Sequence, residues 1–413
     1  MEWLPSGRIL FEISVVSALI LLPIIKIKEN KDELDGIMEE FFKNAKLTFD
    51  KDKIPSLIDK KVKEGEKLLI YKIPVGWGKS KFEKHREALE HILDGKVKIW
   101  NRGNKLFIKA LTSKLESMIR YDEKEVVKSI EKLKLGTVIG YERGNKLVTN
   151  DFSESGCHLF IGGPTDMGKS SCIRSIIMSM AQSYSPSYLN FYFIDLKKIE
   201  LPLLEDLDHV IGETATNYKS AVDILLKLCK KIDKRERIIQ EINKNSTRKV
   251  TKIYDTNIDI PRIVCVIDEV AEFEGDEAVM KLIHRISRLG RAFAIHLIAS
   301  TQRPTVDVLP GNIKNNFVAR LAFACPSKTD SKTIVDNGMA AEIIDESMED
   351  EDSLPKGRGI YKKGSMFREV QIPWISPDRL VTMINKTKKG NSINKEVNKL
   401  ETKNTKEYRG EKL

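Results

Sequence analysis

A glycine-rich segment that ends in Gly-Lys-Ser has the composition and spacing of a phosphate-binding loop. Four residues separate Gly163 from Gly168-Lys169-Ser170; the apolar stretch HLFIG precedes the loop and SSCIRSIIMSMAQ follows it. A strand before such a loop and a helix after it bring backbone N–H groups and the positive end of a helix dipole to phosphate oxygens. We therefore expect the segment to bind ATP, with Lys169 on the β- and γ-phosphates and Ser170 on Mg²⁺. The residues expected at the nucleotide are Gly163, Pro164, Thr165, Asp166, Met167, Gly168, Lys169, Ser170 and Ser171.

Two acidic residues end a second apolar stretch, RIVCVIDE. Asp268 would stand at the carboxyl end of a buried strand and face Mg²⁺. Glu269 beside it has the chemistry of a general base that polarises the attacking water. The alternative is an acidic pair that only caps the following turn. The phosphate-binding loop in the same chain favours the catalytic interpretation.

A third apolar stretch, AIHLIASTQRP, ends in polar residues and has arginines ahead of it. Gln302, the last of the three polar residues, is our candidate for contact with the γ-phosphate or its water. ATPases that assemble as rings use an arginine of one subunit at the nucleotide of the next. Arg291 is the preferred candidate for this role, and Arg285 and Arg288 are alternatives. For each of the three, a surface or ion-pair role remains open.

Short apolar stretches alternate with helical patterns over residues 136–385. The stretches LNFYFIDL, RIVCVIDE, AIHLIAST and VARLAFAC are rich in branched residues, as strands buried on both faces are. Strands of this kind separated by helices predict an α/β fold, a P-loop ATPase motor whose mostly parallel sheet carries helices on both faces. This segment is the expected motor domain.

A smaller α+β domain is predicted over residues 66–130, because branched and aromatic runs flank turn residues there and a helical period lies between them. Residues 29–65 are charged with helical spacing and are predicted to form a helical linker. The elements expected in the small domain are a strand at 67–75, a helix at 80–93, and strands at 96–101 and 105–111.

Residues 1–28 contain an apolar stretch. Ile13–Ile25 is uncharged and lies just after Glu12. A membrane span needs about 20 apolar residues, so this one is short and carries one costly charge near its start. A signal peptide is the alternative, but no A-x-A cleavage site follows. We expect an N-terminal membrane helix with Lys26 and Lys28 on the cytoplasmic side.

The chain is basic overall, with 70 basic and 60 acidic residues and a net charge of +10. An excess of this size favours an anionic partner such as nucleic acid or a lipid surface. Half of the excess falls in residues 386–413, which are poor in apolar residues and are predicted to be a disordered basic tail. A basic arm that contacts DNA phosphates is the alternative for this tail.

Five segments in a fixed order carry a resemblance to a known family. They read GGPTDMGKSS, FIDLKKIEL, VCVIDEVAEF, SRLGRAFAIHLIASTQRPTVDVLPGNIKNNFVARLAFAC and SKTDSKTIVDNGMA. Together they resemble the motor domain of the FtsK/SpoIIIE family of DNA translocases over roughly residues 136–385. The resemblance implies a RecA-like fold that assembles as a hexameric ring and pumps DNA. It also places Asp195 and Lys197 in an ID-x-K motif, and Asp330, Ser331 and Asp336 in a late motif that completes the nucleotide pocket or a subunit contact.

The chain departs from the chromosome-dedicated members of the family, which carry a C-terminal winged-helix module and a four-span membrane domain. What remains resembles the compact FtsK-like coupling proteins of Gram-positive conjugative elements. The resemblance implies an ATPase that spans the bacterial plasma membrane once and delivers DNA to a conjugation channel, with a relaxase and the channel proteins as partners. The alternatives are a chromosome or phage DNA translocase and a type VII protein-secretion ATPase.

Overall fold

The chain folds into two compact units that divide after Thr112. The computed structural model describes residues 31–388, except positions 51, 64, 113–114, 246, 248, 257, 306–307 and 348–354. The predicted membrane helix over residues 1–28 and nearly all of the predicted tail, 389–413, lie outside this description. Within the part described, no helix combines the length and the apolar character that a bilayer span requires.

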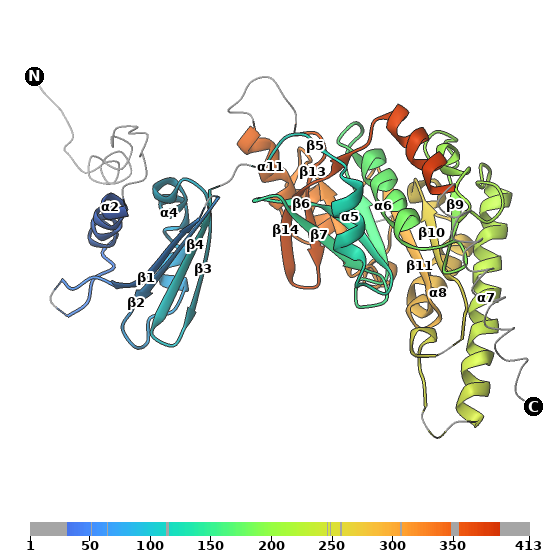
Figure 1. Ribbon diagram of the computed structural model, residues 1–413, viewed down its shortest axis with the longest axis horizontal. Helices are drawn as coiled ribbons and strands as arrows, with labels where there is room; N and C mark the ends of the chain where they lie inside the picture. The colour runs from blue at the N-terminus through green and yellow to red at the C-terminus, as the bar shows by residue number, and fades with distance from the viewer. Residues whose placement is uncertain are drawn as a thin grey trace, which may run out of the picture. The chain divides into compact units, whose positions relative to one another are not determined.

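The first unit is a four-stranded antiparallel sheet with helices on one face (Figure 1). Its strand order is β1-β2-β4-β3. The strands are β1 (Ser56–Lys63), β2 (Glu66–Lys72), β3 (Lys96–Arg102) and β4 (Lys105–Leu111), and the helices are α2 (Lys31–Asn44), α3 (Ser80–Glu83) and α4 (Arg86–Leu93).

Two sequence predictions for this region are wrong. Residues 29–65 are not a linker, because α2 buries Met38 and Phe42 in the core of the first unit and β1 pairs with β2 along its length. The pattern missed β1 because its apolar residues are outnumbered by charged ones. The predicted helix at 80–93 is two helices, α3 and α4, separated at Lys84 and His85. The strands expected at 67–75, 96–101 and 105–111 are present as β2, β3 and β4.

The second unit is built on a nine-stranded sheet in the order β7-β6-β14-β13-β12-β8-β11-β10-β9. The five strands from β12 to β9 are parallel, and the other four extend the sheet from β12 by antiparallel pairing. The sheet is therefore mixed, and the expectation of a mostly parallel sheet holds only for its nucleotide-proximal half. The strands are β6 (Gly136–Glu142), β7 (Lys146–Asp151), β8 (Leu159–Gly162), β9 (Leu189–Ile194), β10 (Arg262–Ile267), β11 (Ile295–Thr301), β12 (Ala319–Phe323), β13 (Arg358–Lys363) and β14 (Met366–Gln371).

Helices pack against this sheet, and the long helix α7 runs beside α8 (Figure 1). The second unit starts earlier than predicted, because α5 places Val126 and Ile130 in its core rather than in that of the first unit. The predicted boundary at residue 130 is thus wrong. The helices are α5 (Glu123–Ile130), α6 (Lys169–Ser183), α7 (Tyr218–Asn245), α8 (Glu277–Phe293), α9 (Gly311–Lys314), α10 (Lys328–Val335) and α11 (Met339–Ser347), and the short strands β5 (Ile119–Arg120) and β15 (Pro373–Trp374) pair with each other.

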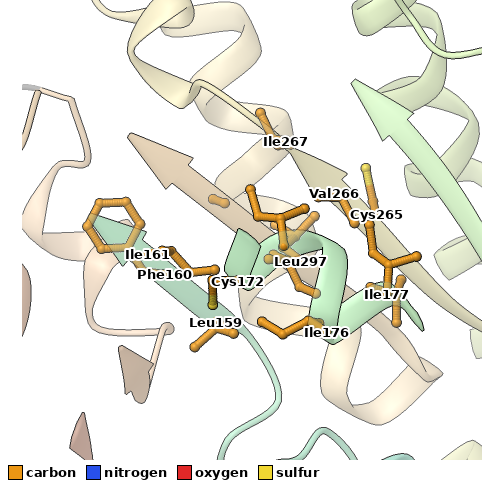
Figure 2. Packing of buried hydrophobic residues seen from close by; sticks show 14 of the residues in the cluster. Leu159, Phe160, Ile161, Cys172, Ile176, Ile177, Cys265, Val266, Ile267 and Leu297 are labelled. Carbon is orange, nitrogen blue, oxygen red and sulfur yellow. The ribbon is translucent and has the colours of Figure 1, made fainter. Parts of the chain in front are cut away.

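The core around β8 and α6 holds the segment predicted to bind phosphate. Figure 2 shows side chains of β8 and α6 packed with those of β10 and β11. Each fully buried Leu or Ile stabilises the fold by about 1.5–3 kcal/mol relative to the exposed side chain. Both ends of the loop between β8 and α6 are therefore anchored in a rigid core. The residues labelled there are Leu159, Phe160, Ile161, Cys172, Ile176, Ile177, Cys265, Val266, Ile267 and Leu297.

Asp336 ends α10 in a left-handed conformation, with φ 60°. Its carboxylate pairs with Arg320 Nη1 at 2.6 Å, Lys314 Nζ at 2.8 Å and Lys362 Nζ. Burial opposes its ionisation, but hydrogen bonds from Lys314 and Lys362 and the charge of Arg320 outweigh burial and lower its pKa to about 2. Because Arg320 stands near the start of β12, the cluster lies at the edge of the sheet opposite the carboxyl ends of the parallel strands. Asp336 thus takes no part in the chain's own nucleotide pocket, contrary to one of the two roles expected for it.

We expect Asp336→Asn to lower the melting temperature at pH 7. The folded-state pKa lies below the ordinary value of 3.8, so the ionised carboxylate stabilises the fold above about pH 4, and this contribution is lost as the pH falls toward 2. The difference in melting temperature between the wild type and the variant should therefore shrink over that range. Glu213→Gln, at an exposed carboxylate, is the control. A difference that stays constant between pH 7 and pH 3 would contradict the ion-pair account.

Candidate nucleotide-binding site

The carboxyl ends of parallel strands bring the predicted site residues together at one edge of the sheet. β8 ends at Gly162, β10 at Ile267 and β11 at Thr301, and the three strands are neighbours in the order β8-β11-β10. The loop between β8 and α6, the acidic pair after β10 and Gln302 after β11 therefore meet. Open α/β sheets bind their ligands at such an edge.

The loop is held in a shape that requires its glycines. Gly168 has φ 106° and stands immediately before α6. A Cβ there would lie 2.8 Å from the Cα of Gly357, and one on Gly163 would lie 2.6 Å from the Cβ of Phe323. The backbone N–H of Gly357 also donates to the Met167 carbonyl at 2.9 Å. Segments at Phe323 and Gly357 thus fix the loop from the side, a support that the motif itself did not predict.

Lys169 is buried, with 5% of its surface exposed, and its ammonium group has no hydrogen-bond partner among the described residues. The nearest carboxylate atom is Glu269 Oε2, at 3.6 Å from Nζ, which is long for a hydrogen bond. Burial lowers the pKa of Lys169, although the charges of Asp268 and Glu269 oppose this shift. A buried ammonium group that has no hydrogen-bond acceptor costs folding free energy. Lys169 is therefore placed to receive an anionic oxygen.

Glu269 is fixed from three sides. Its carboxylate accepts hydrogen bonds from the backbone N–H of Gln302 at 3.1 and 3.2 Å and from Lys197 Nζ at 3.1 Å, and Lys169 lies on another side. Burial raises the pKa of Glu269, but the positive charges of Lys169 and Lys197 outweigh it, and the pKa falls below its ordinary value. The group is thus an oriented, ionised carboxylate, which is the state a general base requires.

Asp268 and Ser170 supply the oxygen atoms that Mg²⁺ prefers. Asp268 is buried, and the Ser300 hydroxyl donates to its carbonyl and lies 3.5 Å from its Oδ1. Burial raises the pKa of Asp268, with the neighbouring carboxylate of Asp195 acting in the same sense and Lys169 in the opposite one. A buried carboxylate that resists ionisation in this way, at the same edge of the sheet as the Ser170 hydroxyl in the first turn of α6, fits a site completed by a cation.

Gln302 connects the loop to the acidic pair. Its side-chain Oε1 accepts a hydrogen bond from the Thr165 hydroxyl at 3.2 Å, while its backbone N–H donates to Glu269. The structure therefore brings together the phosphate loop, both acids and Gln302, as the sequence predicts. It places Gln302 between the loop and the candidate base.

The three candidate arginines are not at this site. Arg291 is exposed in the last turn of α8, just before β11 begins, and its charge acts on Cys157 ahead of β8. That is the opposite edge of the sheet. Arg285, in the same helix, pairs with Asp233, and Arg288 is exposed. An arginine from this helix can thus reach a nucleotide only at another subunit.

Lys197 is a site residue for which the sequence predicted no contact. It follows β9 in a turn organised by Asp195, whose buried carboxylate accepts hydrogen bonds from five successive backbone N–H groups, those of residues 197–201. The turn carries Lys197 to Glu269. The signal in the sequence is an acid at the end of an apolar stretch with a lysine two residues later, FIDLK. It does not say which of the distant carboxylates the lysine meets.

Comparison with known sequences identifies the segment that contains the candidate nucleotide-binding site. The sequence model of the FtsK/SpoIIIE family matches residues 118–306. Residues 118–306 are an FtsK/SpoIIIE-family domain. The matched range runs from before β6 through the phosphate loop, the acidic pair and Gln302. This match confirms the resemblance for the sequence segments that lie within residues 118–306.

Curated relatives that match this chain include DNA translocases. The DNA translocase FtsK of Staphylococcus aureus is 34% identical over 200 residues, 45% of this chain and 25% of the relative. That of Leptospira interrogans is 33% identical over 265 residues, 62% of this chain and 27% of the relative. The chain thus spans about a quarter of the length of these relatives.

Solved structures of other ATPases share the fold. The conjugation coupling protein TcpA of pCW3, determined with ATPγS, matches with a TM-score of 0.54 at 21% identity, over 85% of this chain and 99% of that one. EssC of Geobacillus thermodenitrificans, ATPases 2 and 3, matches with a TM-score of 0.51 at 14% identity, over 68% of this chain and 51% of that one. At these identities the likeness concerns the fold.

Proposed function

We propose that the chain is an ATP-driven DNA translocase and acts as a coupling protein that delivers DNA to a conjugation channel. The observation that carries the ATPase part is the buried Lys169 ammonium, which has no hydrogen-bond partner in the described part of the chain and lies next to the oriented carboxylate of Glu269. The FtsK/SpoIIIE-family domain supports DNA as the substrate. The fold shared with the conjugation coupling protein TcpA, over 85% of this chain, supports the coupling role.

In the proposed reaction each side chain acts on ATP from the position described. Lys169 and the loop N–H groups neutralise the β- and γ-phosphates, while Ser170 and Asp268 hold the cation. Glu269 accepts a proton from the water whose oxygen bonds to the γ-phosphorus as the bond to the ADP oxygen breaks. Gln302 orients that water. Magnesium, when bound, offsets charge on the phosphate oxygens.

We also propose a homo-oligomer, a hexameric ring, that contacts DNA mainly through phosphates and without strong sequence preference. The basic net charge of +10 supports an anionic partner. A single-pass anchor over residues 1–28 would hold the motor on the cytoplasmic side of the bacterial plasma membrane. A relaxase and the channel proteins would then be its partners.

The test of the proposed function is the ATPase activity of the full chain in detergent. The rate is measured without nucleic acid and with duplex DNA, single-stranded DNA or heparin, at two salt concentrations. We expect DNA to stimulate turnover and the stimulation to fall as salt rises, because phosphate contacts release counterions. Stimulation by heparin alone, or none by DNA in protein that binds ATP, would overturn the DNA motor.

Two alternative functions use the same ATPase site. A chromosome or phage DNA translocase would also respond to DNA, and a loss-of-function strain would separate the two, since only the coupling protein is required for conjugative transfer. A type VII protein-secretion ATPase is supported by the fold it shares with EssC. The EssC structure comprises ATPases 2 and 3, whereas the present sequence contains one G-x4-G-K-S motif. DNA stimulation would exclude this alternative.

Arg291→Ala should lower ATP turnover by about a thousandfold if Arg291 stabilises the transition state in the neighbouring subunit. Mixing Arg291→Ala subunits with Lys169→Ala subunits should restore activity, because the second kind supplies an intact arginine to the intact pocket of the first. Arg237→Ala, at an exposed arginine of α7, is the control and should retain activity. Mixed oligomers that remain inactive would exclude Arg291 as the residue acting between subunits.

Lys197→Met should lower kcat about tenfold and leave the KM for ATP nearly unchanged, because Glu269 keeps its charge but loses one of its orienting partners. Lys197→Arg retains a donor and should recover part of the loss. Lys198→Met, at the exposed neighbour that does not contact Glu269 in the described structure, is the matched control. A rise in KM with kcat unchanged would instead place Lys197 on the nucleotide.

A further inference from the structure

One face of the first unit's sheet is open. Side chains alternate across each strand, and Ile99 of β3 and Ile108 of β4 point to the face that forms the core with the helices. The opposite face carries Trp100 and Phe107, which are half-buried and do not belong to that core. No described element of the first unit packs over them.

Along β3 and β4, this open face has an ordered pattern. The rings of Trp100 and Phe107, directly opposite each other in the register, are stacked, with centroids 5.2 Å apart and planes 6° from parallel. Two residues further along each strand, on either side of the rings, basic residues face each other. These pairs are Lys98 with Lys109 and Arg102 with Lys105. A strand rise of about 3.3 Å per residue puts the two basic pairs about 13 Å apart, with the aromatic pair midway.

This arrangement is unfavourable for the sheet by itself. Like charges directly opposite each other on antiparallel strands destabilise the pairing. Of the four basic residues, Lys109 is compensated by Glu66, at 2.8 Å. Within the described part of the chain, no carboxylate pairs with Lys98, Arg102 or Lys105. Uncompensated positive charge thus flanks both sides of a half-buried aromatic stack, which points to an anionic, aromatic ligand.

We propose that this open face binds single-stranded nucleic acid. Unpaired bases continue the stack of Trp100 and Phe107, and the sugar–phosphate backbone runs between Lys98 on one side and Lys105 on the other. Stacking on strand aromatics within a basic surface is how sequence-tolerant single-strand binding works, since every base has a π-face. In duplex DNA the base faces are covered by their neighbours. A lipid bilayer would use the lysines but gain little from two rings that stack on each other.

The site lies on a folding unit separate from the one that holds the nucleotide site. Its contacts are distinct from those by which the motor would track DNA, and it adds a second nucleic-acid site to the proposed function. Variants on the open face should therefore leave ATP binding and the DNA-free ATPase rate unchanged. A negative result in the ATPase test would therefore count against the proposed motor function, and a negative result in the binding test would count only against this site.

Photo-crosslinking on the full chain locates the contact. A 30-nucleotide oligo(dT) containing 4-thiothymidine is irradiated with the protein, and the crosslinked peptides are identified by mass spectrometry. We expect crosslinks within residues 96–111. Crosslinks confined to residues 113–388 would overturn the proposal, because the motor would then account for all single-strand binding.

Binding measurements with variants test the chemistry. Trp100→Ala should weaken oligo(dT) binding about tenfold, the size of one base–aromatic contact, and Trp100→Phe should recover most of the affinity. Lys98→Ala with Lys105→Ala should lower affinity and flatten its salt dependence. Lys84→Ala, at an exposed lysine after α3 on the helical side, is the matched control. Thermal unfolding establishes that each variant is folded.

The same variants distinguish single-stranded nucleic acid from a lipid surface or duplex DNA as the ligand of the open face. If Trp100→Ala weakens binding to vesicles of phosphatidylglycerol and phosphatidylcholine but not to oligo(dT), the face is a membrane surface and the proposal is wrong. If it weakens duplex and oligo(dT) binding equally, base stacking is not involved and the proposal is wrong as well. If Trp100→Ala weakens only the binding of oligo(dT), the result supports the proposal.

Discussion

Lys169→Ala is expected to abolish ATP turnover. The variant removes the buried ammonium that is placed to receive phosphate oxygens, and no other cation can take its position: Lys197, the second lysine at the site, is engaged with Glu269. Removing one fixed positive group from a water-poor catalytic site costs on the order of a hundredfold to a thousandfold in rate. Nucleotide affinity should fall as well, because Lys169 contacts the phosphates in the bound ground state. Turnover and equilibrium binding of a fluorescent ATP analogue are the measurements.

The same substitution should not unfold the protein. Lys169 Nζ has no hydrogen-bond partner among the described residues, so its loss leaves no donor or acceptor newly unsatisfied. Lys169→Met keeps the volume of the side-chain stem and is the matched variant: it should be as inactive as Lys169→Ala and at least as stable as the wild type without nucleotide. If the variant still hydrolysed ATP at the wild-type rate, the loop would take no part in ATP hydrolysis.

Glu269→Gln is expected to separate binding from hydrolysis. The amide retains an oxygen that can accept the backbone N–H of Gln302, but it cannot take a proton from water. General-base catalysis contributes about a hundredfold to ten-thousandfold, so turnover should fall by that factor. ATP binding should persist, because Lys169 and the loop N–H groups are unchanged. The ATP-bound assembly should then accumulate and be visible by size-exclusion chromatography with light scattering.

Glu272→Gln is the control for that substitution. Glu272 is exposed in the turn three residues further on and has no part in the site, so its variant should behave as the wild type. Rapid hydrolysis by Glu269→Gln would exclude Glu269 as the base. In that case Asp268, the other acid at the end of β10, would become the next candidate.

The parts of the fold that the sequence predicts are those in which one local pattern determines the outcome. β10 and β11 are continuous branched apolar stretches buried on both faces, and the residues that follow them must lie at the same edge because the strands are parallel. The meeting of Lys169, Glu269 and Gln302 follows from that rule alone. The need for glycines in the loop follows similarly from the motif, whereas the support that the loop receives from Phe323 and Gly357 does not.

The parts that the sequence does not predict depend on pairing between distant segments. β13 and β14 carry mixed polar residues, so nothing in their composition says that they extend the motor sheet in antiparallel fashion. β1 has more charged than apolar residues and is recognised as a strand only through its pairing with β2. The contact of Lys197 with Glu269 joins residues 72 positions apart. Such contacts require the assembled sheet.

The turn after β9 behaves mechanically as one piece. A single carboxylate, that of Asp195, binds the backbone N–H groups of residues 197–201, so this segment cannot change shape without breaking several hydrogen bonds at once. Lys197, at the start of this segment, contacts Glu269, and Ile199, within the same segment, is 63% exposed to solvent. A displacement of the lysine when charge at Glu269 changes is therefore also a displacement of an apolar surface residue. The turn would therefore couple a movement of Lys197 beside Glu269 to a movement of an apolar residue on the protein surface.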